Sequence, residues 1–223
     1  AIGVFVARLL GQSWRLTAPQ WRAILVFGIC QNALYLGLYW VAFRTVEASL
    51  AAIIASTMPL LVALAGWLLL GERVARLGVA GLVAGFAGVA LIMGARFQGG
   101  ADPAGVALCV IGVLALAVAT LTMRGISSGG NFLMVVGLQM LVGAVVLLPF
   151  ALAFEEIRID WSWQLVAAYL YTILVPGLAA TLVWFLLVHR IGAVKAATFH
   201  FLNPFLGVAL AAVLLGERLG PLD

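Results

Sequence analysis

Charged side chains are scarce in this 223-residue chain. Asp, Glu, Lys and Arg together make up 9% of the residues, whereas hydrophobic residues make up 65%, and the mean hydropathy is +1.22. Soluble domains carry about 25% charged residues, and a soluble core of this size could not bury so much apolar surface. Lipid must therefore surround most of the chain, which predicts an all-α integral membrane protein.

Cysteine and histidine are also scarce, with two residues of each type. Cys30 and Cys109 lie in apolar runs, so we predict two small buried side chains and neither a disulfide, a metal site nor a cofactor. The net charge of +4 comes from Lys and Arg residues that stand singly between apolar runs. This pattern indicates the charge asymmetry of a membrane protein, and it does not favour nucleic-acid binding.

Acidic residues are absent from the middle of every apolar run. All eight lie in predicted loops or at helix ends, which argues against proton or sodium coupling through a carboxylate within the runs. Catalytic groups are lacking too. Ser127 and Ser128 form a loop without a Gly-x-Ser-x-Gly elbow, and no His/carboxylate cluster occurs, so we do not expect an enzyme.

Apolar runs long enough to cross a bilayer fill most of the chain. About twenty residues are needed for one crossing, and residues 1–10 supply about half a span. The complete predicted spans are residues 23–43, 48–70, 77–93, 104–123, 132–154, 165–188 and 193–215. We therefore predict seven complete spans and one partial span.

One stretch of the sequence occurs twice, 145 residues apart. Met-Pro-Leu-Leu at 58–61 and Leu-Leu-Gly-Glu-Arg at 69–73 recur as Asn-Pro-Phe-Leu at 203–206 and the same five residues at 214–218. The copies lie on the second and seventh complete spans. Because five crossings separate them, they run in opposite directions, which predicts an inverted repeat. In the same register, three alanines recur: Ala48, Ala51 and Ala52 as Ala193, Ala196 and Ala197.

Two five-helix halves are the architecture that this repeat predicts. The first is residues 1–95, incomplete at its N-terminal end, and the second is residues 103–223, without its last helix. Completing both halves gives ten spans. Of the twelve Lys and Arg residues, eight fall on one side and four on the other, and the richer side should be cytoplasmic. We expect a multi-pass protein of the bacterial inner membrane, with both termini of the full chain in the cytoplasm.

Polar residues on the first complete span are candidates for a binding cavity. Gln31, Tyr35 and Tyr39 are four residues apart and should form one stripe along an α-helix, with Asn32 beside it. Polar groups that face lipid would be unsatisfied, so the stripe should face protein or water. Lining a cavity and hydrogen bonding between helices are both compatible with this pattern.

Proline residues predict where helices break. Pro59 and Pro204 each remove one backbone hydrogen bond in mid-membrane, and Ser56 and Asn203 stand beside the breaks. Paired breaks in two halves indicate a central binding site. Pro176 is a third candidate hinge.

Three further residues near these breaks are candidates for binding. His200 shares a helix face with Asn203, and either a solute-binding or proton-linked role or a packing role would explain it. Tyr171 and Trp184 flank Pro176. The complete set of predicted cavity-lining residues is Gln31, Asn32, Tyr35, Tyr39, Ser56, Tyr171, Trp184, His200 and Asn203.

The two proline-broken helices that end in Leu-Leu-Gly-Glu-Arg, the first followed by a Gly-rich span at 78–88, resemble a known family. They are similar to the EamA-like branch of the drug/metabolite transporter superfamily, over nearly the whole chain. The resemblance implies ten spans, cytoplasmic termini, and export of small metabolites such as amino acids, or of drugs. It does not select one substrate.

We therefore expect a small-metabolite exporter that works by alternating access in the lipid bilayer, with its solute between the two repeats. Without a carboxylate in the predicted lining, zwitterionic or weakly anionic solutes fit better than cations. A nucleotide-sugar or sugar-phosphate exchanger is the alternative, but it would need several cations at mid-depth, which only Lys195 approaches. An intramembrane enzyme and a non-transporting scaffold are distant alternatives, and a homodimer is left open.

Overall fold

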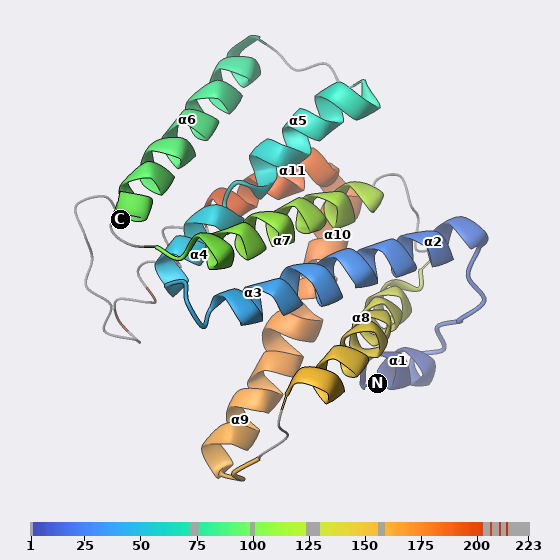
Figure 1. Ribbon diagram of the computed structural model, residues 1–223. Coiled ribbons are helices and arrows are strands. Elements are labelled where there is room, and N and C mark those ends of the chain that lie inside the picture. The colour runs from blue at the N-terminus through green and yellow to red at the C-terminus, as the bar shows by residue number, and fades with distance from the viewer. Residues whose placement is uncertain are drawn as a thin grey trace. The chain divides into compact units, whose positions relative to one another are not determined.

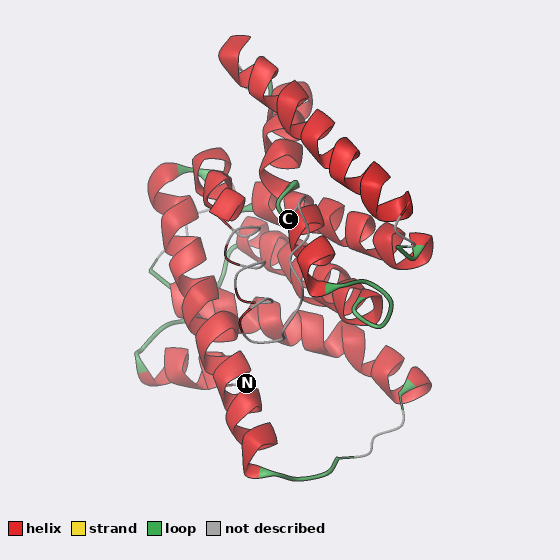
Figure 2. Cartoon of the chain, turned by 90° about the vertical axis from the view of Figure 1, so that its left-hand side faces the viewer, coloured by secondary structure: helices red, strands yellow, loops and turns green. Residues whose placement is uncertain are grey.

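A computed structural model describes residues 2–71, 76–98, 101–123, 130–155 and 159–202, together with 206, 210 and 213. Within these residues every regular element is a helix and no strand occurs (Figures 1 and 2). By their contacts, the residues group into two compact units. Unit 1 comprises 1–33 with 122–192, and unit 2 comprises 34–121 with 193–223. Each unit thus draws residues from both predicted sequence repeats.

Unit 1 is built around one long helix, α8. This helix contacts α1, α2 and α10. Glycines bring the α1 and α8 backbones close together, because a Cβ on Gly137 would lie only 2.7 Å from the backbone N of Val4. The helices of unit 1 are α1 (Ile2–Leu9), α2 (Ala18–Phe27), most of the π-helix η1 (Gly28–Tyr35), α8 (Phe132–Phe154), α9 (Trp163–Thr172), the π-helix η2 (Ile173–Ala180) and α10 (Thr181–Ile191).

Unit 2 is arranged around α5, which contacts α6, α11 and η3 (Figure 1). Helix α7 packs on α3, since a Cβ on Gly112 would lie 3.0 Å from the ring of Tyr39. The helices of unit 2, besides the end of η1, are α3 (Leu36–Ala42), α4 (Ala48–Ala55), α5 (Met58–Leu70), α6 (Arg76–Gln98), α7 (Pro103–Thr122), α11 (Ala193–Ala197) and the 3-10 helix η3 (Thr198–Leu202).

Five helices of the described chain are long and apolar enough to cross a membrane: 18–42, 48–69, 103–122, 132–154 and 163–191. Large apolar side chains are exposed on them, including Phe154 at 83% and Tyr169 at 66%, as lipid contact requires. The predicted third span is a shorter apolar helix, Gly78–Leu91, in the described residues. Of the predicted seventh span, residues 193–202, 206, 210 and 213 are described, and the others lie outside the described residues.

The boundaries of the helices recur with the spacing of the sequence motif. Helix α2 begins at Ala18 and α9 at Trp163, and α4 begins at Ala48 and α11 at Ala193. The π-helical segments coincide as well, since η1 spans 28–35 and η2 spans 173–180. These boundaries therefore return 145 residues later, whereas the ends of α3 and α10, at 42 and 191, do not.

Helices α2 and α9 also start with similar chemistry, on an extended residue with a hydroxyl group. Thr17 precedes α2, and its backbone N–H donates to Gln20 Oε1 at 2.8 Å. Ser162 precedes α9, and its Oγ accepts from the backbone N–H of Leu165 at 3.1 Å. Such caps satisfy donors that the first turn of a helix leaves free.

Candidate functional site

The predicted site residues are divided between the two units. Gln31, Asn32, Tyr171, Pro176 and Trp184 belong to unit 1, and Tyr35, Tyr39, Ser56, Pro59 and His200 belong to unit 2. Asn203 and Pro204 lie outside the described residues.

A cavity of about 320 Å³ lies within unit 2. Its volume falls at the lower end of the range, roughly 300 to 1,000 Å³, that small-molecule sites occupy. Of the predicted residues, Tyr35 and Tyr39 line it. The lining residues that the structure describes are Tyr35, Tyr39, Phe43, Ala48, Ala51, Ala52, Ala55 and Leu206.

Three aromatic rings from one helical stretch form one wall of this cavity. The Tyr35 and Tyr39 ring centroids are 4.6 Å apart, and those of Tyr39 and Phe43 are 6.1 Å apart in an edge-to-face arrangement. Tyr39 is 5% exposed, and its hydroxyl donates to the carbonyl of Ala51 at 3.4 Å. Mutual ring contacts and this bond fix the wall in place.

Four alanines on α4 form another part of the lining. Positions 48, 51, 52 and 55 share one face of an α-helix, so four methyl groups lie where larger side chains would fill the space. The sequence contained both signals. The four-residue spacing continues from Tyr35 and Tyr39 to Phe43, and the three repeated alanines extend to Ala55 in the same helical register.

A helix break adjoins the cavity. Helix α4 ends at Ala55 and α5 begins at Met58, with Pro59 in its first turn. Pro59 cannot donate a hydrogen bond and would clash with the preceding turn of a continuous helix. The hydroxyls of Ser56 and Thr57 donate to the carbonyls of residues 53 and 54 at 2.6 and 2.7 Å. Ser56 therefore caps the break and is not among the lining residues.

Gln31 lies outside this lining although it was predicted to share a stripe with the two tyrosines. The stripe assumes α-helical turns, but residues 28–35 form a π-helix, whose wider turn moves residues four apart onto different faces. The Oε1 atom of Gln31 is buried and has no hydrogen-bond partner in the described structure.

Asn32 bonds across unit 1 to α8. Its Nδ2 donates to the backbone carbonyl of Gln139 at 3.1 Å and also to Gln139 Oε1. Gln139 is 0% exposed, and its Nε2 has no partner among the described residues. Two glycines allow this close crossing: a Cβ on Gly28 would lie 2.6 Å from the Gln139 carbonyl, and one on Gly143 would overlap Asn32. Asn32 thus makes a hydrogen bond between helices.

The remaining predicted residues are not among the described lining residues of the unit 2 cavity. Tyr171 is 63% exposed, and Trp184 is half-buried on α10. Pro176 lies inside η2, where its carbonyl accepts a hydrogen bond from the Thr181 hydroxyl at 3.4 Å. His200 is half-buried on η3. Among the described residues, no group of three or more His, Cys, Asp or Glu side chains could hold a metal.

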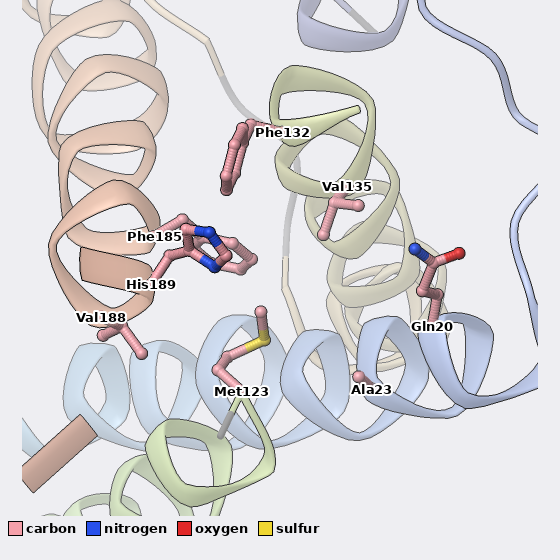
Figure 3. A pocket seen from close by; sticks show the side chains of 8 residues that line it. All are labelled: Gln20, Ala23, Met123, Phe132, Val135, Phe185, Val188 and His189. Carbon is pink, nitrogen blue, oxygen red and sulfur yellow. The ribbon is translucent and has the colours of Figure 1, made fainter. Parts of the chain in front are cut away.

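A second, water-sized cavity of about 20 Å³ lies in unit 1 (Figure 3). The Phe132 and His189 rings meet edge to face above it, with centroids 5.5 Å apart. A water molecule needs roughly 10–15 Å³ of such volume, so this space does not accommodate a metabolite. Its lining is Gln20, Ala23, Met123, Phe132, Val135, Phe185, Val188 and His189.

Outside the spans, one carboxylate joins two connections of unit 2. Asp102 accepts hydrogen bonds from the backbone N–H groups of Ala104 and Gly105, at 3.2 and 2.9 Å, and so caps α7. A hydrogen bond from the Thr45 side chain, together with these backbone bonds, holds the pKa of Asp102 below its usual value.

Known proteins resemble this chain over nearly its whole length. The model of the EamA-like transporter family matches residues 1–94 and 103–223. The uncharacterized transporter YvbV of Bacillus subtilis (strain 168) is 30% identical over 200 residues, which cover 89% of this chain and 66% of YvbV. Protein PecM of Dickeya dadantii (strain 3937) is 24% identical over 221 residues, covering 98% of this chain and 74% of PecM. The chain thus spans about two thirds of the length of YvbV.

Proposed function

The chain belongs to the EamA-like transporter family, as its Gly-Glu-Arg motifs indicated, and we propose that it exports small metabolites by alternating access. The observation that carries this proposal is the cavity of unit 2, which adjoins an interrupted apolar helix. A solute-sized space beside a broken membrane helix is typical of transporter sites, because backbone groups that a break leaves without partners are tolerated only within protein or beside water.

The architecture we propose is a ten-span inverted repeat of two five-helix halves, residues 1–95 and 103–223 in this chain. Recurrence of the helix boundaries after 145 residues supports it, as does the odd number of crossings between the copies of the motif. The interruptions at η1, at η2 and before Pro59 would be the points where helices bend when access alternates.

The proposed orientation in the membrane follows from the charges. The side richer in Lys and Arg would be cytoplasmic, in a bacterial inner membrane, with both ends of the complete protein on that side. The solute would leave the cell through the protein, which acts as a transporter without a catalytic residue. A homodimer is compatible with this proposal.

Amino acids and similar zwitterionic or weakly anionic solutes are the substrates that we propose, with drugs as further candidates. No charged side chain is among the lining residues that the structure describes, so a phosphorylated sugar or nucleotide sugar would lack a cationic partner there. This favours metabolite export over the sugar-phosphate alternative.

His200 is the residue through which we propose any proton linkage, because it is half-buried in the 3-10 segment beside α11 and α5. If flux depends on pH through this side chain, His200→Ala should remove the dependence. Retention of full, pH-dependent flux in the variant would rule out proton linkage through His200 without affecting the transport proposal.

Counterflow in proteoliposomes tests the proposed function. Liposomes preloaded with one unlabelled amino acid should accumulate the same labelled amino acid only when they contain the protein. Tyr39→Ala should lower this uptake about tenfold or more, since loss of apolar contact in a pocket costs 10- to 200-fold. Tyr169→Ala is the matched control, because Tyr169 is 66% exposed and is not among the described lining residues. Absence of uptake of every amino acid tested would overturn the proposed substrate class.

A further inference from the structure

The aromatic side of the unit 2 cavity is rigid. Tyr39 is held by its contact with α7 at Gly112, by its hydrogen bond to the Ala51 carbonyl and by the rings on both sides of it. An immobile wall cannot widen to admit a larger group. The size of an acceptable solute must therefore be set by the side chains of the remaining lining.

Ala52 is the most suitable residue to set that size. Ala51 and Ala55 are buried at 1% and 6% exposure, whereas Ala48 and Ala52 are half-buried and reach the open space. Ala48 is the first residue of α4, whereas Ala52 lies in its interior, and the Ala52 carbonyl accepts a backbone hydrogen bond from Ser56 at 3.0 Å. Its backbone is thus fixed, and only its side chain determines the free volume beside it.

The equivalent alanines in the second copy are packed differently. Ala193, Ala196 and Ala197 are 3%, 0% and 0% exposed, in a segment that contacts α5. Both copies contain the alanines, but in the described structure only the first copy presents half-buried alanines to a solute-sized cavity. Selection by size would therefore depend on the first copy.

The chemistry of the lining restricts the ligand further. Among the described lining residues, rings and aliphatic groups predominate, and the tyrosine hydroxyls are the only polar side-chain groups. A charged group here would lose its hydration without a compensating partner. We propose that the cavity binds the uncharged, apolar side group of the transported solute and that Ala52 sets the largest group it accepts. This inference rests on the proposed transport function and names a determinant of its specificity.

Alkylation of a single cysteine tests binding independently of flux. Ala52→Cys would be placed in a Cys30→Ala/Cys109→Ala background and treated with N-ethylmaleimide in nanodiscs. Alanine, valine, leucine and phenylalanine, as free amino acids, are the probes. Protection against alkylation should increase with the size of the apolar side group until the group no longer fits the cavity. Ala107→Cys on α7 is the control, because Ala107 is exposed and outside the cavity, and it should not be protected.

Counterflow of the same four amino acids through Ala52→Leu tests selectivity. The larger amino acids should lose about tenfold or more in uptake relative to alanine, since one methylene in an apolar pocket changes discrimination 10- to 200-fold. Ala107→Leu should keep the wild-type order. The Ala52→Leu protein must elute as a single peak in size-exclusion chromatography, and Ala52→Val provides a smaller step if it does not.

The outcomes separate this inference from the transport proposal. Two results would overturn the inference and leave transport intact. In one, the wild type takes up the amino acids but none of them protects Ala52→Cys. In the other, the order of uptake among the four amino acids is unchanged in both Ala52→Leu and Ala52→Val. Protection without uptake would support the binding site and overturn transport of these solutes. If neither protection nor uptake occurs, both the inference and transport of these solutes are overturned. Slow alkylation of Ala52→Cys that no amino acid alters would indicate a cavity filled by lipid, which also overturns the inference.

Discussion

Two interrupted helices occupy equivalent places in the sequence, yet they differ in chemistry. The first interrupted helix is α2–η1–α3, residues 18–42, and the second is α9–η2–α10, residues 163–191. Both become π-helical after ten residues, but Pro176 of the second stands where the first has Gln31. Gln31 retains its N–H group, so proline is not required for the wide turn. The interruption belongs to the repeated architecture, and proline is one residue that it tolerates.

The surroundings of the two interruptions differ as well. In unit 1, Gly28 and Asn32 of the first interrupted helix lie directly against α8. Ile173 and Gly177 take the equivalent positions in the second, where no residue of α9 or η2 is buried in the described structure. The first interruption is therefore held by close packing on another helix and by hydrogen bonds to it. The second is held by half-buried Leu178, which packs on the cluster of Ala7, Leu133 and Met134, and by a hydrogen bond within its own helix. We expect substitutions at the first to cost more stability.

Gly143→Ala should have the largest effect. A Cβ on Gly143 would overlap Asn32 and lie 3.2 Å from the carbonyl of Gly28, so the helices must separate, and overpacking costs about 1–3 kcal/mol or more. Thermal unfolding in detergent should show a marked fall in Tm. Gly81→Ala is the matched control, since nothing lies within 4 Å of its added Cβ, and alanine gains roughly 1 kcal/mol over glycine in a helix. Equal Tm values for the two variants would contradict the close packing of η1 on α8 at Gly143.

Asn32→Ala should have the next largest effect, because it leaves the fully buried amide of Gln139 without its partner. Such an orphaned group costs about 1–3 kcal/mol. The double variant Asn32→Leu/Gln139→Leu should be more stable than Asn32→Ala and recover most of the lost stability, since both partners are then apolar. The readout is the free energy of unfolding in a denaturant series.

The second interrupted helix offers the control for this pair. The Thr172 hydroxyl bonds only to the Ala168 carbonyl of its own helix, at 2.8 Å, and Thr172 is exposed. Thr172→Val should change the unfolding free energy by less than about 0.5 kcal/mol. If Thr172→Val proved as costly as Asn32→Ala, the two interruptions would be equally fixed and the comparison would fail.

The sequence predicted these helices better than it predicted their contacts. Hydropathy revealed the apolar segments, because lipid imposes a strong constraint on composition, and the repeated motif revealed the 145-residue period. The π-helix at Gly28–Tyr35 could not be predicted, since no proline marks it and periodicity alone assumes α-helical turns. Tyr35 and Tyr39 both line the unit 2 cavity, and their role in binding stays a prediction. The Asn32–Gln139 bond joins residues 107 apart, a tertiary pairing that no local pattern specifies.

Pro176→Ala should have a small effect. In an α-helix, replacing an interior proline would stabilise the protein by about 3 kcal/mol. In η2 the wide turn already relieves the clash, and the first interrupted helix forms the same turn without proline, so we expect a change below about 1 kcal/mol. The measurement is the Tm of the variant against that of the wild type. A large rise in Tm would show that proline alone causes the interruption.

Asp102 bonds to the connection that follows the first interrupted helix, and its replacement should have the smallest effect on the Tm. This effect should depend on pH. Residues 43–47 form this connection, and the Thr45 side chain bonds to Asp102, whereas Gly192 alone follows the second interrupted helix. Because folding lowers the pKa of Asp102 from 3.8, the carboxylate stabilises the protein above that value, and this contribution is lost as the pH falls through the lower pKa of the folded state. Asp102→Asn should therefore lower the Tm slightly at pH 7, and the difference from the wild type should disappear once the pH falls below the folded-state pKa of Asp102. Thr45→Val should reduce the same difference in part, since backbone bonds from Ala104 and Gly105 remain. A difference that persists unchanged at low pH would mean that the Asp102 charge contributes nothing, and the two connections would then differ only in length.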